Sequence, residues 1–230
     1  MRKQTKKLAA AALAAALSLA SAMTSFAFYQ EPASKKGLLI SQQHMFDDVL
    51  ELGVDQVICN QASYQNLDTY MPLAQNCKNH GITFTMILLN NFGASDPDLL
   101  PVDAPVEGVG NYAFNSKTPE GEAAVRNYAR AMANYYGDYV SNWVIGNEIN
   151  DAAACDYNGI SDMDEHAASY AKTFRIFYDE IKAVNPEARV FIPFDMRWKA
   201  TNDPLRYTVS EYLPKLNALL KDTEYGIAWH

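Results

Sequence analysis

Short apolar runs alternate with segments of helical periodicity along most of the chain. Unbroken apolar runs are typical of strands buried in a sheet, whereas apolar residues spaced by three and four are typical of helices. The runs predict six strands, over residues 37–41, 54–59, 82–89, 143–146, 190–194 and 227–229. The periodic segments predict five helices, over residues 45–52, 67–80, 119–136, 162–184 and 212–220.

The two longest predicted helices have clear start signals. Thr118 followed by Pro119 is a favourable N-cap with proline in the first turn. Ser161 and Asp164 have the spacing of a capping box, and Asn185 before a proline predicts where that second helix ends.

Strands and helices that alternate in this way predict an α/β protein with a parallel sheet covered on both faces. Two architectures fit the pattern: a (β/α)8 TIM barrel and a doubly wound open sheet. No Gly-x-Gly-x-x-Gly or Walker sequence follows the first strand, so a nucleotide-binding version has no support.

The N-terminus has the three regions of a secretory signal peptide. A cationic start precedes an apolar run over residues 8–20. Two sites with the small-x-small pattern of signal-peptide cleavage follow, at residues 20–22 and 25–27. A membrane anchor or an amphipathic helix is the alternative. We therefore expect a signal peptide over residues 1–27, a linker over 28–36, a partial barrel domain over 37–230, and secretion from a bacterial cell.

The net charge disfavours a nucleic-acid partner. The chain has a formal charge of -8, and loss of the signal peptide would leave 15 cations against 27 anions. A nucleic-acid-binding domain needs a positive surface to neutralise phosphates. No later apolar stretch is long enough to cross a membrane, so we expect no membrane association after cleavage. Nothing in the sequence indicates an oligomeric state.

Polar residues directly follow most of the predicted strands. In a barrel of parallel strands the chemistry is carried at the carboxyl ends of the strands. Loops are polar in any protein, which explains each residue singly but explains the set less well. The set comprises Asn60, Asn90, the segment 147–150, Asp195 and His230.

The segment Trp143-Val-Ile-Gly-Asn-Glu-Ile-Asn150 resembles the fourth strand of clan A glycoside hydrolases, which are (β/α)8 barrels. The resemblance implies that Glu148 is the general acid/base and that Asn147 contacts the sugar 2-hydroxyl. Within the clan, the chain is most similar to exported bacterial proteins known only as domains of unknown function. The resemblance also implies a carbohydrate substrate, retaining hydrolysis and no cofactor.

Retaining hydrolysis needs a second carboxylate, about 5–5.5 Å from the first, as the nucleophile. In clan A this residue ends strand seven, whereas the present chain stops at strand six, and Glu224 lies at the wrong end of the barrel. We therefore expect about six of eight βα units, a nucleophile beyond His230, and a fragment that is poorly soluble or inactive alone.

The remaining candidate residues would shape a sugar subsite. We expect Asn60, Asn90, Asp195, Trp198, Trp229 and His230 to contact substrate. Aromatic side chains can stack on sugar faces, although ordinary packing is the simpler interpretation for each one. The aromatic candidates in loops also include Tyr112, Phe114 and Tyr157.

Two other function classes stay open. A non-catalytic carbohydrate-binding or degenerate barrel would keep the fold without the chemistry. A lyase or an esterase on the same fold is the weaker alternative, and the usual Gly-x-Ser-x-Gly elbow of esterases is absent from the sequence.

Histidines, cysteines and loop acids show no metal-ligand spacing, so we expect no metal site. His44, His80 and His166 fall on predicted helices or helix starts and are expected at the surface. Free, partly buried thiols are the simple interpretation of the three cysteines, whereas Cys59 and Cys155 could pair as a disulfide in an exported protein.

Overall fold

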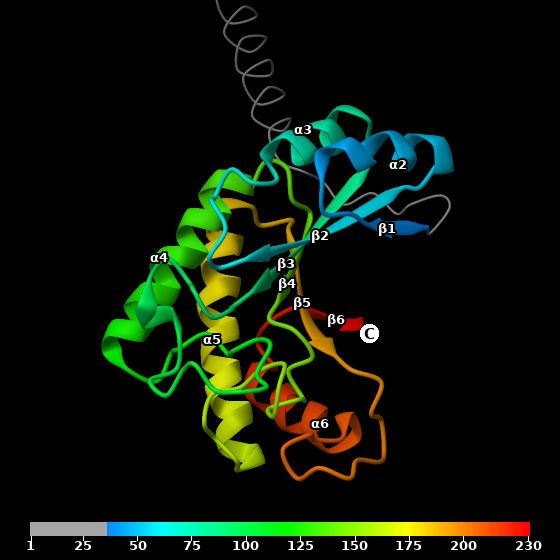
Figure 1. Ribbon diagram of the computed structural model, residues 1–230. Helices are drawn as coiled ribbons and strands as arrows, with labels where there is room; N and C mark the ends of the chain where they lie inside the picture. The colour runs from blue at the N-terminus through cyan, green and yellow to red at the C-terminus, as the bar shows by residue number, and fades with distance from the viewer. Residues whose placement is uncertain (1–35) are drawn as a thin grey trace, which may run out of the picture.

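A single parallel sheet of six strands organises the molecule. The structure is a computed structural model and describes residues 36–230. The strands pair in sequence order, each parallel to the next, without a point where the order reverses (Figure 1). They are β1 (Gly37–Leu39), β2 (Gln56–Ala62), β3 (Thr83–Leu89), β4 (Asn142–Ile145), β5 (Arg189–Phe194) and β6 (Tyr225–Trp229).

The helices connect these strands on the outer side of the curved sheet. Because successive crossovers are right-handed and advance in one direction, they place the helices on one face. This arrangement confirms an incomplete (β/α)8 barrel and excludes the doubly wound sheet, which needs helices on both faces. The helices are α2 (Phe46–Leu52), α3 (Met71–Asn79), α4 (Pro119–Tyr136), α5 (Met163–Val184) and α6 (Val209–Leu220), with short 3-10 helices η1 (Gln43–Met45) and η2 (Pro97–Leu99).

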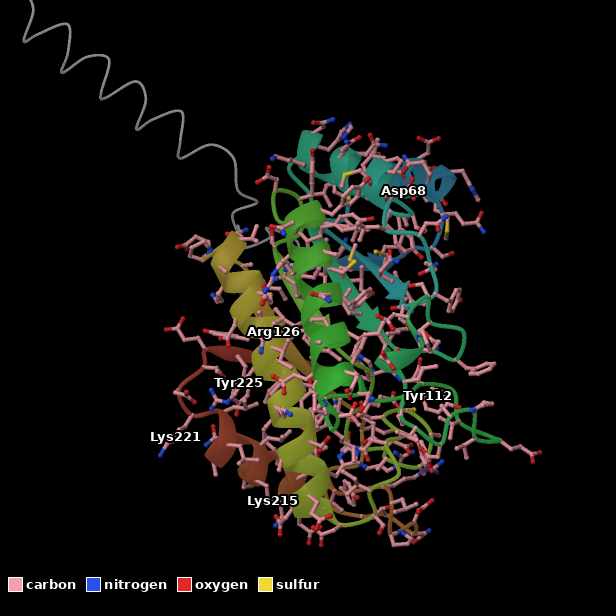
Figure 2. The ribbon with its side chains drawn as sticks, turned by 90° about the vertical axis from the view of Figure 1, so that its left-hand side faces the viewer. Asp68, Tyr112, Arg126, Lys215, Lys221 and Tyr225 are labelled. Carbon is pink, nitrogen blue, oxygen red and sulfur yellow. The ribbon has the colours of Figure 1, made fainter. Side chains whose placement is uncertain are left out.

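The hydrophobic core lies between the sheet and the helices. Alternate strand residues face outward and are fully buried, including Val57, Phe84, Trp143 and Val190. The helices α4 and α5 lie side by side over this face (Figure 2). Glu180 of α5 pairs there with Arg126 and Arg130 of α4, at 3.4 and 2.9 Å.

The inner face of the sheet forms a half-barrel with two open edges. It surrounds a cavity of about 280 Å³ lined by Ile58, Ile87 and Phe191 among others. Leu39 of β1 and Ile227 of β6 are 57% and 44% exposed, because these two strands form the edges of the sheet.

Two local predictions are wrong. The helix α5 is capped by Asp162, whose carboxylate accepts hydrogen bonds from the backbone N–H of Asp164 and Glu165, so Ser161 is not its N-cap. His166 is fully buried, because it lies one turn before Tyr170 on the apolar side of α5. His44 and His80 are exposed as expected.

The predicted signal peptide (1–27) and residues 28–35 of the predicted linker lie outside the described residues. Over residues 36–230, no helix is both long enough and apolar enough to span a membrane.

Candidate active site

The turn that follows β4 carries the central candidate, Glu148. Gly146 has φ +85°, and a Cβ atom there would lie 3.2 Å from Cγ2 of Ile149, so this position favours glycine. Glu148 itself has φ +42° and is the one non-glycine residue with positive φ in the part of the chain that the structure describes. A glutamate in this region costs about 1–3 kcal/mol, and such strain concentrates at functional sites.

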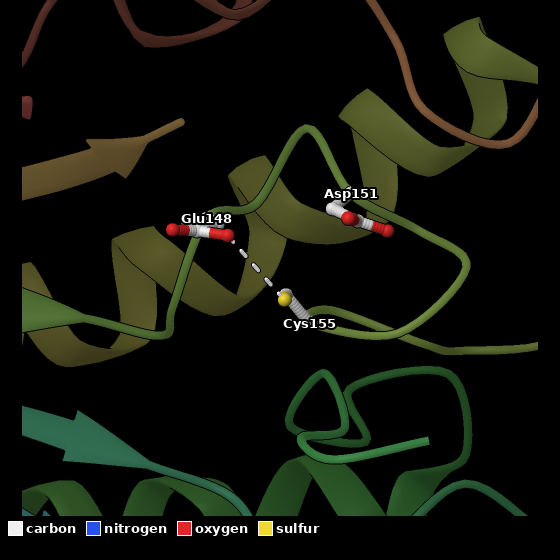
Figure 3. Close-up of side chains that lie close together, drawn as sticks. All are labelled: Glu148, Asp151 and Cys155. Carbon is white, nitrogen blue, oxygen red and sulfur yellow. Dashed lines mark hydrogen bonds between the residues drawn. The ribbon is translucent and has the colours of Figure 1, made fainter. Parts of the chain in front are cut away.

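The carboxylate of Glu148 lies at the mouth of the half-barrel, between two other side chains. Its Oε1 is 3.4 Å from Nδ1 of His230, the residue after β6. Its Oε2 accepts a hydrogen bond from Sγ of Cys155 at 3.5 Å (Figure 3). The Glu148 side chain is 28% exposed, so it is open to a ligand from solvent. Asn147, the predicted 2-hydroxyl partner, is half-buried beside it.

Asp151 approaches the same group but is already paired. One oxygen from each of Glu148 and Asp151 and the sulfur of Cys155 lie within 4.8 Å of one another. However, Oδ2 of Asp151 is 3.1 Å from Arg197 and 3.2 Å from Arg206, and its side chain is 3% exposed. Two guanidinium groups already neutralise this carboxylate, so it suits neither a metal ion nor the nucleophile of a retaining enzyme.

Asp195 is a structural residue and not the substrate contact that the sequence predicts. It is 4% exposed, and its carboxylate accepts hydrogen bonds from Arg197 and from Nδ2 of Asn150, the latter at 2.7 Å. The Asn150 side chain also accepts from the Asp195 backbone N–H at 3.0 Å and donates to the Tyr207 carbonyl. These bonds join the ends of β4 and β5 and fix the turn that carries Glu148.

Asn90 is also unavailable to a sugar. It is 1% exposed, accepts from Ser63 at 3.0 Å, and donates to the carbonyls of Leu99 and Ala113. Its position at a strand end therefore serves to hold the long loop that follows β3.

Two tryptophans form an exposed pair near the site. Trp198, in the loop after β5, and Trp229, at the end of β6, have ring centroids 5.6 Å apart and are 46% and 51% exposed. Asn60 is also exposed, within β2 and not at its end. Tyr112 and Phe114 are buried, so ordinary packing explains both, whereas Tyr157 is half-buried and donates to Asp103.

A buried polar cluster supports the loop between β4 and α5. His166 contacts the Tyr212 hydroxyl through Nδ1 at 2.7 Å and the Asp156 carbonyl through Nε2 at 3.1 Å. Burial lowers the pKa of His166 to about 4 and raises the pKa of Asp156 well above its usual range. The Asp156 carboxylate also lies beside this imidazole, with Oδ2 3.6 Å from Nε2 of His166, so the cluster holds the loop through contacts between buried polar groups.

Neither the contact of Cys155 with Glu148 nor the supporting roles of Asn150 and Asp151 could be predicted from the sequence. Cys155 follows Glu148 by seven residues in an irregular loop, a spacing that signals no contact. All three cysteines are free thiols, so the Cys59–Cys155 disulfide is not formed. Cys59 and Cys77 are buried in the core, whereas Cys155 reaches the site.

A family model, "Family of unknown function (DUF5722)", matches residues 61–230. The chain belongs to the DUF5722 family. The match includes Glu148 and the three residues that contact or adjoin it, Asn147, Cys155 and His230. Among curated proteins, none matches the DUF5722 chain.

Solved structures similar to the DUF5722 chain include clan A glycoside hydrolases. Fungal beta-1,4-galactanases align with a TM-score of 0.53 at 17% identity, covering 84% of this chain and 62% of theirs. The GH53 catalytic domain of Ignisphaera aggregans aligns with 0.54 at 17% identity, covering 80% and 51%. A psychrophilic family 10 endo-beta-1,4-xylanase aligns with 0.51 at 16% identity, covering 81% and 58%.

These similarities establish the fold, a barrel of alternating parallel strands and helices. The chain spans 62% and 51% of the length of the first two structures. The barrel class that the sequence predicted is thereby confirmed.

Proposed function

We propose that this protein is a glycoside hydrolase in which Glu148 is the general acid/base. The observation that carries the proposal is the strained Glu148 backbone, which holds a partly exposed carboxylate at the carboxyl end of β4. Barrel enzymes place their chemistry at this end of the strands, and the fold is that of glycoside hydrolases. The N-terminal signal-peptide pattern supports secretion, which would place the substrate outside the cell.

The proposed reaction is retaining hydrolysis of an O-glycosidic bond in an oligosaccharide or polysaccharide. Glu148 donates its proton to the leaving oxygen as the bond from that oxygen to the anomeric carbon breaks, and the bonding pair stays on the oxygen. A second carboxylate, the nucleophile, attacks the anomeric carbon and forms a glycosyl-enzyme. Glu148 then removes a proton from the water that releases the sugar.

Nearby side chains would hold the sugar. Asn147 adjoins Glu148 and can bond the 2-hydroxyl, a contact that strengthens in the oxocarbenium-like transition state. The exposed rings of Trp198 and Trp229 offer an apolar surface for a sugar face. Asn60 is exposed and completes the set of polar candidates for holding the sugar, whereas His230 contacts the Glu148 carboxylate.

A substrate screen of the full-length protein tests the proposal. 4-Methylumbelliferyl glycosides and plant polysaccharides would be incubated with the wild type and with Glu148→Gln, and sugar release measured. We expect hydrolysis that falls at least about 100-fold in Glu148→Gln, as befits a lost general acid. Equal rates in the two proteins would remove Glu148 from the mechanism.

A non-catalytic carbohydrate-binding barrel is the second candidate, and the exposed Trp198–Trp229 pair favours it as much as it favours an enzyme. Binding of oligosaccharides would be followed by quenching of tryptophan fluorescence. Equal binding to the wild type and to Glu148→Gln, without cleavage of the oligosaccharide, would support this candidate.

A further inference from the structure

The thiol of Cys155 faces the carboxylate of Glu148 across the loop that follows β4. Figure 3 shows the two side chains directed toward each other, with Sγ 3.5 Å from Oε2. His230 lies on the other side of the same carboxylate, 3.4 Å from Oε1. The two oxygens of Glu148 therefore have different neighbours.

Cys155 is held in place by Asp151. The Asp151 backbone carbonyl accepts hydrogen bonds from the N–H groups of Cys155 and Asp156, at 3.0 and 2.9 Å. Its carboxylate accepts from the Ala154 N–H at 3.1 Å, and Arg197 fixes that carboxylate in turn. The position of the thiol thus follows from a buried ion pair and not from a flexible loop.

The thiol carries its hydrogen at neutral pH. Burial first, and then the charges of Asp151 and Glu148, raise the pKa of Cys155 to about 12. A protonated thiol is a weak hydrogen-bond donor, and Oε2 is the acceptor within its reach.

We propose that Cys155 is a positioning residue, whose S–H donates to Oε2 of Glu148 and leaves Oε1 as the oxygen that transfers the proton. This assignment rests on the proposed function. The proton on Oε1 moves to the glycosidic oxygen as the bond to the anomeric carbon breaks, and the bonding electrons remain on that oxygen. Cys155 keeps its own hydrogen throughout and forms no covalent bond to the substrate.

The contact itself can be tested without a substrate. Methyl methanethiosulfonate would be reacted with the full-length protein at about pH 9, and peptide mass spectrometry would follow Cys155 alone. Removing the Glu148 charge eases ionisation of the thiol, so we expect Glu148→Gln to raise the reaction rate roughly tenfold. The matched control, Glu51→Gln on the exposed side of α2, is expected to leave the rate unchanged. An unchanged rate in Glu148→Gln would overturn the contact.

The positioning role is tested by leaving-group dependence. Cys155→Ala is expected to lower kcat/KM about tenfold for a substrate with an alkyl leaving group, which needs protonation. The same variant should barely alter a dinitrophenyl glycoside, whose leaving group departs without a proton. Cys155→Ser keeps a donor and should restore most of the loss. Equal losses on both substrates would indicate a merely structural residue and overturn the role.

The two tests separate the failure of this inference from the failure of the proposed function. If the wild type hydrolyses no glycoside, the proposed function is wrong, and so is the role of Cys155 in proton transfer. A faster modification of Cys155 in Glu148→Gln would still establish the contact between the thiol and the carboxylate. Hydrolysis that depends on Glu148 but not on Cys155 overturns this inference alone.

Discussion

The imidazole of His230 lies 3.4 Å from the carboxylate of Glu148, Nδ1 to Oε1, and so joins the end of β6 to the end of β4. Two strands separated by β5 in the sheet thus bring their carboxyl ends to one place, as the curvature of a barrel requires. This contact defines where a reacting group would meet Glu148.

Loss of the His230 imidazole should impair turnover more than binding. Because His230 contacts the oxygen assigned to proton transfer, we expect His230→Ala in the full-length protein to lower kcat about tenfold with little change in KM. Steady-state kinetics on the substrate found by screening would check this. An unchanged kcat would show that the contact has no part in the reaction.

Backbone strain at Glu148 predicts an effect on stability that is separate from chemistry. At φ +42° a glycine is unstrained, whereas an alanine is not. Glu148→Gly should therefore be more stable than Glu148→Ala by about 1 kcal/mol in the free energy of unfolding. In urea denaturation the glycine variant should unfold at the higher urea concentration. If Glu148→Ala proved the more stable of the two, the left-handed conformation of this residue would be wrong.

Asn150 should be the most sensitive asparagine in the site for folding. Asn150→Ala leaves the Asp195 carboxylate and the Tyr207 carbonyl short of a buried donor, and the Asp195 N–H loses its acceptor. We expect a loss of about 3 kcal/mol in the free energy of unfolding, measured by urea denaturation. Asn127→Ala, on the exposed face of α4, is the control and should change stability by only about 0.5 kcal/mol or less. Equal effects in the two variants would contradict the buried network.

His166 should resist protonation. Its folded pKa of about 4 lies below the unfolded value of about 6.5, so its contribution to stability is fully present above about pH 6.5 and is lost as the pH falls toward 4. In a histidine NMR titration the His166 ring signals should stay in the neutral form until the pH nears about 4. Titration of this ring near its unfolded pKa would contradict its burial.

The sequence predicted the fold well because the fold depends on local patterns. Each apolar run became a strand, and Thr118 before Pro119 capped α4 as expected, with its hydroxyl accepting from the Gly121 N–H. Glu148 could be singled out because strand, turn and motif are contiguous in the chain. Its neighbours could not be predicted, since the contacts to Cys155 and His230 depend on loop conformation and sheet curvature.

The errors have two causes. Asn90 and Asp195 were predicted as substrate contacts because they follow strands, yet both are buried and bonded to other loops. His166 was predicted at the surface because it falls at the start of a predicted helix, although its position on α5 belongs to the apolar face. The partners that bury Asn90 and Asp195 include Ser63 and Asn150, which are distant in sequence, whereas the burial of His166 follows from its helical spacing to Tyr170.

Chemical rescue of Glu148→Ala tests the central claim most directly. A retaining glycosidase that lacks its acid/base still forms the glycosyl-enzyme from a dinitrophenyl glycoside. Its hydrolysis is then slow, because water needs a general base, whereas an anionic nucleophile does not. We predict that sodium azide restores turnover of Glu148→Ala by at least about tenfold and yields a glycosyl azide with retained anomeric configuration. The contradicting result is an active wild type together with a Glu148→Ala variant whose turnover azide does not raise and which forms no glycosyl azide. That result would show that Glu148 is not the acid/base.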